Sequence, residues 1–258
     1  MSGLPPVALS ALNTPAPACF DLHQVDVRLG AAGRVAALTG VTLQMVCGER
    51  VALVGANGSG KSTLLRTLHG LQRHTAGTLH KPAHLREAML FQRPHMLRLS
   101  ALNNIALGLW LQGLPWAEAR QRAPQALARV DMQDLAARNA RALSGGQQQR
   151  LALARAWALQ PDVWLLDEPT ASLDPHAKRE VEALIADFTS AAPAPGRPPP
   201  TLVFSSHNLG QVKRLASRVV YLERGRVLAD LPVNDFFNPD CLQAHSPQAH
   251  LFVKGETT

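Results

Sequence analysis

The chain has 258 residues, of which 46% are hydrophobic and 17% are charged, and its formal net charge at pH 7 is +7. This hydrophobic content excludes a mostly disordered chain, and no apolar run approaches the roughly 20 residues that cross a bilayer. The length suits one large α/β domain or two small ones. The arginines are scattered and form no dense basic run, which disfavours a tail that binds nucleic acid.

The N-terminal residues 1–18 are rich in Pro and Ala and lack a basic start. They predict a flexible tail rather than a signal peptide, although the run "APAC" leaves a lipoprotein-type cleavage open. The three cysteines, Cys19, Cys47 and Cys241, lie far apart and form no CxxC pair. Their spacing predicts neither a metal site nor a disulfide, which fits a reducing cytoplasm.

The first regular elements predicted along the chain are strands. Residues 20–29 and the start of residues 41–55 alternate in the way that antiparallel strands do. Gly48 and Glu49 then turn the chain into a buried strand at 51–54, which runs directly into a glycine-rich loop. A helix is predicted to follow this loop, in "KSTLLRTLHGL".

The middle of the chain, residues 96–158, is predicted to be mostly helical, and Pro124 marks either a helix start or a kink. Short apolar strands are predicted in "DVWLLDEP" and in "TLVFSSH". The Pro/Ala-rich segment 189–200 between them predicts a surface loop. Residues 218–230 predict a hairpin that turns at Arg224 and Gly225.

The glycine-rich loop "GANGSGKST" matches the P-loop pattern, and it lies between a predicted strand and a predicted helix, as that motif requires. Glycines allow successive backbone N–H groups to converge on phosphate oxygens. Lys61 is predicted to reach the β- and γ-phosphates, and Ser62 to offer its hydroxyl to Mg²⁺. The predicted phosphate-binding residues are Gly55, Ala56, Asn57, Gly58, Ser59, Gly60, Lys61, Ser62 and Thr63.

Two acidic residues, Asp167 and Glu168, end the predicted strand in "VWLLDEP". Taken alone, such a pair is often only a solvated strand end. Beside a P-loop, Asp167 suits a carboxylate that helps to hold Mg²⁺, and Glu168 suits the base that polarises the water attacking the γ-phosphate.

The stretch "LSGGQQQR" places Ser144, Gly145 and Gly146 at the start of a predicted helix, where free N–H groups and the helix dipole favour an anion. It resembles the signature motif of the ATP-binding cassette (ABC) superfamily, and the resemblance covers about residues 20–230. The signature residues that match are Leu143, Ser144, Gly145, Gly146 and Gln147.

The resemblance assigns roles to three further positions. Gln92 in "LFQRP" matches the glutamine that links Mg²⁺ to the transporter contact, and His207 in "SSH" matches the switch histidine that contacts the γ-phosphate. The loop that crosses to the partner corresponds to Ser172, Leu173 and Asp174. The catalytic set implied is Glu168, His207 and Lys61, and the Mg²⁺ set is Ser62, Gln92 and Asp167.

The family resemblance also implies a fold and an assembly. The expected fold is α/β: a P-loop NTPase (RecA-like) core with an antiparallel β subdomain and an α-helical signature subdomain at about 96–158. One nucleotide-binding domain is expected over residues 19–235, followed by a short C-terminal extension over 236–258. Two copies are expected to pair head to tail, so that the signature of one closes over ATP and Mg²⁺ held by the P-loop of the other.

One residue departs from the family pattern. Where the family usually stacks an aromatic side chain on adenine, Leu29 stands in this chain. An aliphatic side chain still covers the base but forfeits stacking energy of the order of 1 kcal/mol. The departure predicts weaker nucleotide binding and looser base selectivity.

A motor subunit of a transporter is the predicted function, because the chain holds one cassette and no long coiled-coil insertion. The implied partners are a second copy, an integral membrane permease and an extracytoplasmic substrate-binding protein, at the cytoplasmic face of the bacterial inner membrane. The runs "FQRPHMLRLSALNNIALGL", "FFNP" and "FVKGE" resemble oxyanion importers of the tungstate and phosphate type. The alternatives are an importer for polar amino acids or other small solutes, a two-component exporter, and an ATPase that acts on nucleic acid, although no nucleic acid partner is expected.

Overall fold

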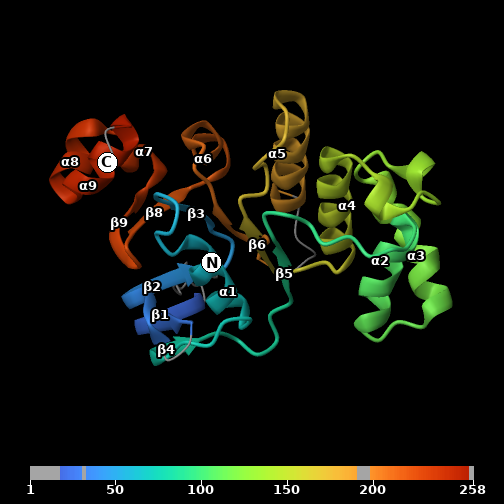
Figure 1. The fold of residues 1–258 in the computed structure, drawn as a ribbon, viewed down its shortest axis with the longest axis horizontal. Helices are drawn as coiled ribbons and strands as arrows, with labels where there is room; N and C mark the ends of the chain where they lie inside the picture. Colours follow the sequence, from blue (N-terminus) through green and yellow to red (C-terminus); the bar gives the residue numbers. More distant parts are fainter. Residues whose placement is uncertain (1–17, 31–32, 191–197, 256–258) are drawn as a thin grey trace, which may run out of the picture.

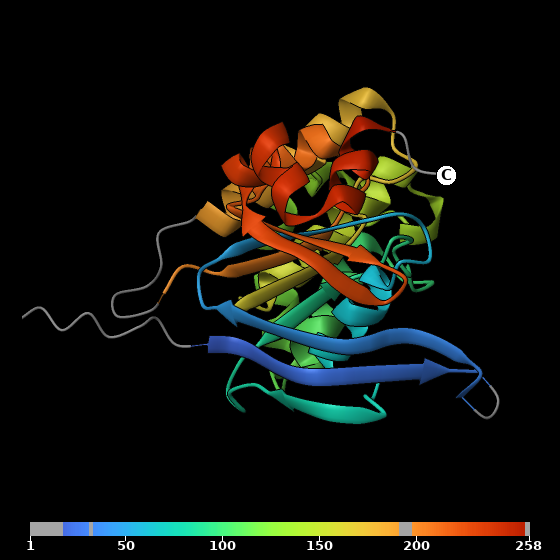
Figure 2. The ribbon, with the colours of Figure 1, turned by 90° about the vertical axis from the view of Figure 1, so that its left-hand side faces the viewer.

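The computed structural model of the chain describes residues 18–30, 33–190 and 198–255, and the described strands form two sheets. Figure 1 and Figure 2 show an antiparallel sheet of three strands lying beneath a sheet of six strands. The strand orders are β2-β1-β4 and β5-β6-β7-β3-β8-β9. The strands are β1 (Ala18–Leu29), β2 (Val35–Val46), β3 (Arg50–Val54), β4 (Ala76–His80), β5 (Glu87–Leu90), β6 (Val163–Asp167), β7 (Thr201–Ser205), β8 (Arg218–Glu223) and β9 (Arg226–Pro232).

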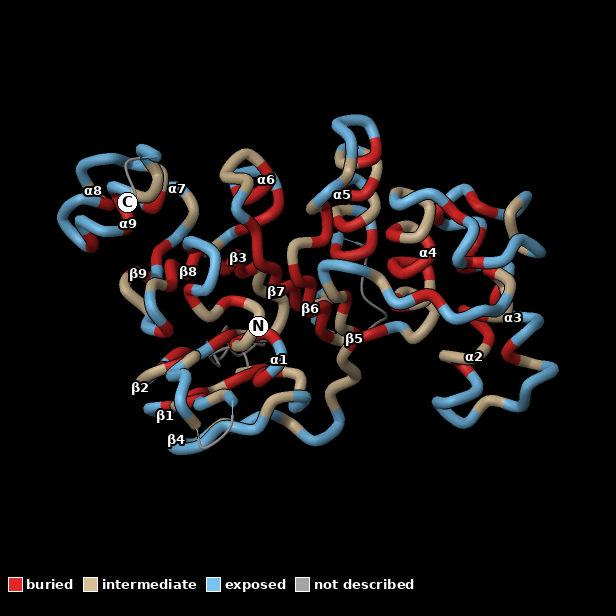
Figure 3. The backbone as a smooth tube through the Cα atoms, viewed as in Figure 1, coloured by how far each residue is buried: buried red, intermediate tan, exposed pale blue. Residues whose placement is uncertain are grey.

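The six-stranded sheet is the buried centre of the molecule (Figure 3). Neighbouring strands from β5 to β8 pair in parallel, and β9 pairs antiparallel to β8. Every residue of β6 and β7 is buried. Because side chains alternate along a strand, Val51 and Leu53 of β3 enter one core while Ala52 and Val54 enter the core on the opposite face. Burial on both faces explains why these strands are continuous apolar runs in the sequence.

The three-stranded sheet packs against the six-stranded sheet through α1 (Lys61–His69). Leu64, Leu65 and Leu68 of α1 are fully buried, and they share one core with β1, β2 and one face of the large sheet. This arrangement fixes the β1–β2 hairpin next to the loop that precedes α1. The predicted strands and the predicted helix of this region are therefore confirmed.

The prediction that the cysteines form no disulfide is wrong, because Cys19 and Cys47 are joined. Cys19 lies in β1 and Cys47 directly follows β2, and the antiparallel pairing of these strands brings their Cα atoms to 5.1 Å. The sequence separation of 28 residues carries no local spacing motif, so only the strand pairing reveals the proximity. Cys241 is a free thiol.

Three helices form the helical part predicted for residues 96–158: α2 (Ala101–Leu111), α3 (Trp116–Ala128) and α4 (Gly145–Ala158). Figure 1 shows them gathered beyond the β5 side of the sheet. Pro124 lies inside α3, so it does not mark a helix start. The other described helices after α1 are α5 (Pro175–Ser190), α6 (Leu209–Leu215), α7 (Val233–Phe236), α8 (Pro239–His245) and α9 (Pro247–Lys254), and short 3₁₀ turns lie at Gln133–Leu135 and Ala140–Ala142.

The C-terminal helices α7–α9 pack on the β8–β9 edge of the large sheet. The rings of Phe252 in α9 and Tyr221 in β8 lie 5.3 Å apart, and the ammonium of Lys213 lies 4.4 Å from the ring of Phe237. The predicted boundary at residue 235 falls inside α7. The segment beyond that boundary is thus continuous with the fold that precedes it.

The structure agrees with only some of the loops predicted from the sequence. The hairpin turn at Arg224 and Gly225 is confirmed, and both residues have the positive φ, 47° and 77°, that a tight hairpin turn demands. The predicted surface loop 189–200 is wrong at Thr189 and Ser190, which still belong to α5. Most of that loop and nearly all of the predicted flexible tail lie outside the described residues. No helix in the described ranges is long and apolar enough to cross a bilayer.

Candidate active site

The glycine-rich loop at residues 55–63 joins the end of β3 to the start of α1. Two of its glycines are sterically required: a Cβ on Gly55 would lie 2.1 Å from the carbonyl oxygen of Leu222, and a Cβ on Gly60 would lie 2.8 Å from that of Ala37. Gly60 caps α1 without a side-chain hydrogen bond, and the first turn of the helix contains no acidic residue. The N–H groups at this helix end are therefore free to bind an anion.

Lys61 is folded back over this loop. Its side chain is buried, and its Nζ donates to the carbonyl oxygens of Gly55 at 2.8 Å and Ala56 at 3.0 Å. Burial lowers the pKa of Lys61, and the carboxylates of Glu168 and Asp167 partly oppose that shift. The hydroxyl of Ser59 is also buried and has no hydrogen-bond partner in the structure. A desolvated ammonium beside an unsatisfied donor fits the phosphate chain of a nucleotide.

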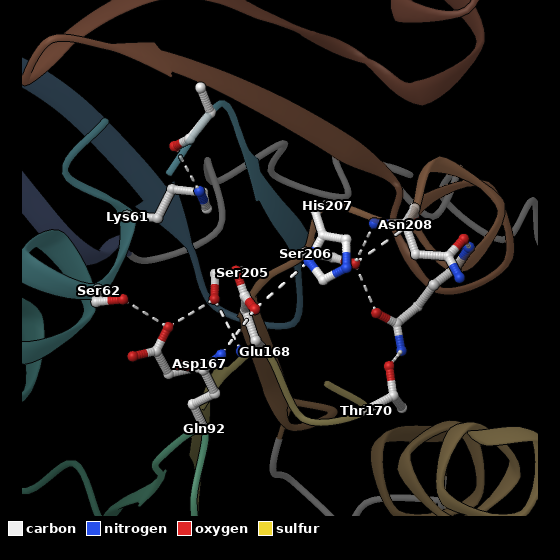
Figure 4. A network of polar contacts seen from close by, with 12 residues as sticks. Lys61, Ser62, Gln92, Asp167, Glu168, Thr170, Ser205, Ser206, His207 and Asn208 are labelled. Carbon is white, nitrogen blue, oxygen red and sulfur yellow. Dashed lines mark hydrogen bonds and ion pairs between the residues drawn. The ribbon is translucent and has the colours of Figure 1, made fainter. Parts of the chain in front are cut away.

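Asp167 ends β6 at the same edge of the sheet. Its Oδ1 accepts hydrogen bonds from the hydroxyls of Ser62 and Ser205, both at 2.8 Å (Figure 4). The described residues contain no group of three or more His, Cys, Asp or Glu side chains placed to hold a metal. One carboxylate and one hydroxyl suit Mg²⁺, which usually takes few protein ligands and completes its shell with phosphates and water.

Two predicted site residues, Gln92 and His207, meet at Glu168. Its Oε2 accepts from the Gln92 amide at 3.2 Å and lies 3.4 Å from Nδ1 of His207. Figure 4 shows these side chains converging from β5, β6 and β7. They meet because the carboxyl ends of neighbouring parallel strands share one edge of the sheet. The Glu168 carboxylate is mostly buried, whereas His207 keeps 62% of its side chain exposed.

Ser205 supports both acidic residues, and the sequence analysis did not single it out. Its fully buried hydroxyl donates to Asp167 and accepts from the Glu168 N–H at 2.8 Å. The hydroxyl that follows the apolar residues 202–204 is the signal that could have found it. A buried series of side-chain hydrogen bonds was also not predicted from the sequence. In it, Ser206 donates to Gln211 at 2.8 Å, and Gln211 donates to Thr170 at 3.1 Å.

A cavity of about 450 Å³ combines the loop, the carboxyl edge and the β1–β2 hairpin. Its volume is in the range of small-molecule and cofactor sites. Leu29 lines it, as the adenine-stacking prediction requires. The full lining is Leu29, Val35, Ala36, Ala37, Asn57, Gly58, Ser59, Gly60, Lys61, Ser62, Thr63, Gln92 and Glu168.

The signature residues lie elsewhere, at the N-terminus of α4. Ser144 caps the helix by accepting from the Gln147 N–H, and the Gln147 side chain accepts from the Ser144 N–H in return. Leu143 is buried below this turn. A Cβ on Gly145 would meet nothing within 4 Å, so this residue is open on its outer side. None of the described residues that line the cavity comes from this turn.

The predicted crossing loop, Ser172–Leu173–Asp174, leads into α5. Ser172 has a φ of +62°, and the Asp174 Oδ1 accepts from the N–H groups of His176 at 2.9 Å and Ala177 at 3.0 Å. These backbone bonds, that of Ala177 above all, lower the pKa of Asp174. The loop is therefore fixed by a helix cap. A Cβ on Gly146 would lie 3.1 Å from that of Ala177, so α4 and α5 touch at this point.

Comparisons with known proteins agree with this geometry. A family model described as "ABC transporter" matches residues 38–171. The nickel import ATP-binding protein NikO of Rhodobacter capsulatus is 42% identical over 217 residues, which cover 77% of this chain and 84% of that protein. The glutamine transport ATP-binding protein GlnQ of Escherichia coli is 33% identical over 234 residues, which cover 85% and 92%.

A solved structure gives the same result for the fold. The dimeric post-hydrolysis state of the ATP-binding cassette MJ0796 bound to ADP and Pi has a TM-score of 0.74 at 27% identity, and the match covers 83% of this chain and 98% of that one. The fold is that of a P-loop NTPase, and the chain is an ATPase. These likenesses show that the chain belongs to the ABC transporter family.

Proposed function

We propose that the chain is the ATP-hydrolysing motor subunit of an importer, which works as a homodimer around two ATP and two Mg²⁺ ions. One observation carries the proposal. The cavity contains the P-loop and the carboxyl edge, but the free helix end at Ser144–Gly146 lies outside its lining. A second copy placed head to tail would supply that helix end to the open side of the cavity.

Each site residue has a distinct proposed role. The loop N–H groups and Lys61 bind the phosphates, and Ser62 and Asp167 hold Mg²⁺ together with Gln92. Bound Mg²⁺ would neutralise charge on the phosphates. Glu168 accepts the proton of the attacking water, because Gln92 and His207 hold its carboxylate at the carboxyl edge. The exposed His207 is free to turn toward the γ-phosphate, and loss of that contact after hydrolysis would loosen the dimer.

The proposed membrane partner would bind near the segment that follows Gln92. Leu97 and Leu99 in this segment are 41% and 36% exposed, so the segment offers two apolar side chains to a partner. We propose that a cytoplasmic helix of a permease covers them, at the inner face of the bacterial membrane. An extracytoplasmic binding protein would deliver the solute.

The candidates for the cargo come from the sequence and from the relatives. The sequence-based prediction of an oxyanion such as tungstate has no support from the two curated relatives described above, whose names refer to nickel and to glutamine. Identity favours nickel as the second candidate, at 42% against 33%. Cargo contacts belong to other subunits, so uptake must be measured to choose among them.

Uptake in cells that carry chromosomal variants tests the proposal. We expect Glu168→Gln to reduce the uptake of one solute at least tenfold, since hydrolysis loses its base. Radiolabelled nickel, tungstate and glutamine are measured in parallel, and the solute whose uptake falls names the cargo. The matched control is Glu180→Gln, a partly exposed glutamate on α5 whose carboxylate lies 3.7 Å from Nδ1 of His176. Unchanged uptake of every small solute, with ATPase activity lost in the purified variant, would overturn the importer assignment.

A further inference from the structure

The contact between Glu168 and His207 joins two loops that lie beyond the strands. The parallel pairing of β6 with β7 ends at Asp167 and Ser205, so Glu168 follows it by one residue and His207 by two. The side chain of His207 is also 62% exposed, so packing alone does not hold it. The distance of 3.4 Å between Glu168 and His207 therefore depends on what fixes the two loops relative to each other.

The side chain of Gln211, in α6, connects these two loops inside the protein. Its Oε1 accepts from the hydroxyl of Ser206 at 2.8 Å, and its Nε2 donates to the hydroxyl of Thr170 at 3.1 Å. Figure 4 shows this series of bonds between Ser206 and Thr170. Gln211 is fully buried, and Ser206 and Thr170 are 3% and 5% exposed. Because all three side chains are buried, removal of the amide would leave hydroxyl groups without their partners.

On one side, the bonds of Gln211 fix the loop that carries His207. The hydroxyl of Ser206 also accepts from the N–H of Asn208 at 3.0 Å, and this bond spans His207. The Oδ1 of Asn208 in turn accepts from the N–H of Gln211 at 3.1 Å, which caps α6. The residues before and after His207 are thus both bonded to Gln211.

On the other side, Gln211 fixes the loop that begins at Glu168. The N–H of Ala171 donates to the carbonyl oxygen of Glu168 at 3.0 Å, so Thr170 lies inside a tight turn that Glu168 starts. The bond from Gln211 to the Thr170 hydroxyl holds this turn against α6. One buried amide therefore connects the turn of Glu168 to the turn of His207.

We infer that Gln211 is a positioning residue for ATP hydrolysis, because its amide sets the place of His207 relative to Glu168. This inference rests on the roles proposed above for Glu168 and His207. Gln211 is not among the described residues that line the nucleotide cavity, so it would act through His207 and not on the nucleotide. A small displacement of a positioned group is enough to slow a reaction strongly while substrate binding is kept.

Two substitutions of Gln211 test the inference. Gln211→Met keeps the length of the side chain and removes both hydrogen bonds, so we expect kcat for ATP hydrolysis to fall roughly tenfold and KM for ATP to change less than about twofold. Gln211→Glu should keep kcat within about threefold of the wild type, because a carboxyl group can bond to both hydroxyls. Steady-state phosphate release measures both constants. Equal losses of kcat in the two variants, or none in Gln211→Met, would overturn the inference.

Two further variants are the controls. Thr189→Val, near the end of α5, also removes a buried hydrogen bond, that from its hydroxyl to the carbonyl oxygen of Ile185, and kcat should stay the same. Ser206→Ala breaks only one of the two bonds of the Gln211 amide and leaves the Thr170 bond and the Asn208 cap in place. Its kcat should fall less than about threefold, and so less than that of Gln211→Met.

A double variant shows whether Gln211 acts through His207. In single-turnover assays with excess enzyme, adding Gln211→Met to His207→Ala should lower the rate by no more than about twofold. A further tenfold loss would mean that Gln211 acts by another route and would overturn the inference. If His207→Ala alone keeps the wild-type rate, the proposed role of His207 is wrong and the inference falls with it. If His207→Ala lowers the rate but Gln211→Met does not, only the inference about Gln211 is wrong.

Discussion

At the scale of single residues, Ser205 holds the two acidic side chains of the site in place. Its buried hydroxyl donates to Asp167 and accepts from the Glu168 N–H, each at 2.8 Å. Glu168 has a φ of +46°, a left-handed conformation that side-chain-bearing residues adopt only when their surroundings stabilise it. The bond from its N–H to Ser205 supplies such stabilisation. Ser205 thus positions both the proposed Mg²⁺ ligand and the proposed base.

We predict that Ser205→Ala lowers kcat for ATP hydrolysis roughly tenfold and changes KM for ATP less than about twofold, because the buried Glu168 N–H loses its acceptor. Steady-state phosphate release measures both constants. Ser206→Ala is the matched control, since it removes the neighbouring buried hydroxyl, which bonds to Gln211 instead. An equal loss of kcat in the two variants would mean that Ser205 acts only through stability.

At the scale of one element, one side of the α4 N-terminus packs against α5, and the other side faces open space. Ser144 and Gln147 satisfy two backbone N–H groups through their reciprocal bonds. Gly146 faces α5, where a Cβ would press on Ala177, while Gly145 faces open space. Within one chain there is therefore a steric reason for glycine at position 146 and none at position 145.

We predict that Gly145→Ala separates folding from assembly. Inside one chain the added methyl meets nothing and reduces the entropy of the unfolded state. The free energy of unfolding should therefore stay the same or rise by about 0.4–1 kcal/mol, and the melting temperature should not fall. In a Glu168→Gln background, however, the methyl should weaken the ATP-dependent dimer at least roughly tenfold, because it occupies the space of the partner's phosphate. Thermal melting and sedimentation measure the two effects.

Gly108→Ala provides the control for this prediction. Gly108 lies inside α2, and its added Cβ would make ordinary contacts of 3.6 Å with Arg155 and Leu159. It should raise stability to a similar degree and leave the ATP-dependent dimer intact. If Gly145→Ala behaves in the same way as Gly108→Ala, no partner phosphate approaches α4.

The range of each interaction along the chain explains what the sequence could predict. The P-loop was predictable because residues 55–63 are contiguous. The strand at 163–167 was predictable because burial on both faces makes its first four residues apolar. Ser205 was missed because its partners lie 37 and 38 positions away, and the Cys19–Cys47 bond was predicted wrongly because only strand pairing creates it. The short and largely exposed β4 has no strong pattern and forms only by pairing with β1.

At the scale of the whole molecule, the two helix ends that are proposed to bind phosphate belong to different parts of the fold. The N-terminus of α1 lies below the large sheet beside the hairpin, whereas α4 stands with α2 and α3 at one end of the molecule (Figure 1). The cavity at α1 has no signature residue in its described lining. On the proposed arrangement each chain would carry two half-sites, and a head-to-tail pair would create two complete ones.

A mixture of two inactive variants tests this division. Lys61→Ala removes the phosphate-binding ammonium and keeps α4 intact, whereas Gly145→Arg fills the open side of α4 and keeps the Ser144 cap and the P-loop intact. Each variant alone has no complete site. In an equal mixture, half of the dimers are mixed and each of these contains one complete site, so we predict about a quarter of the wild-type ATPase rate. The phosphate-release assay should show this recovery increasing with protein concentration, since it depends on dimer formation. A mixture no more active than the separate variants, under conditions where wild-type dimers turn over ATP, would contradict the shared site.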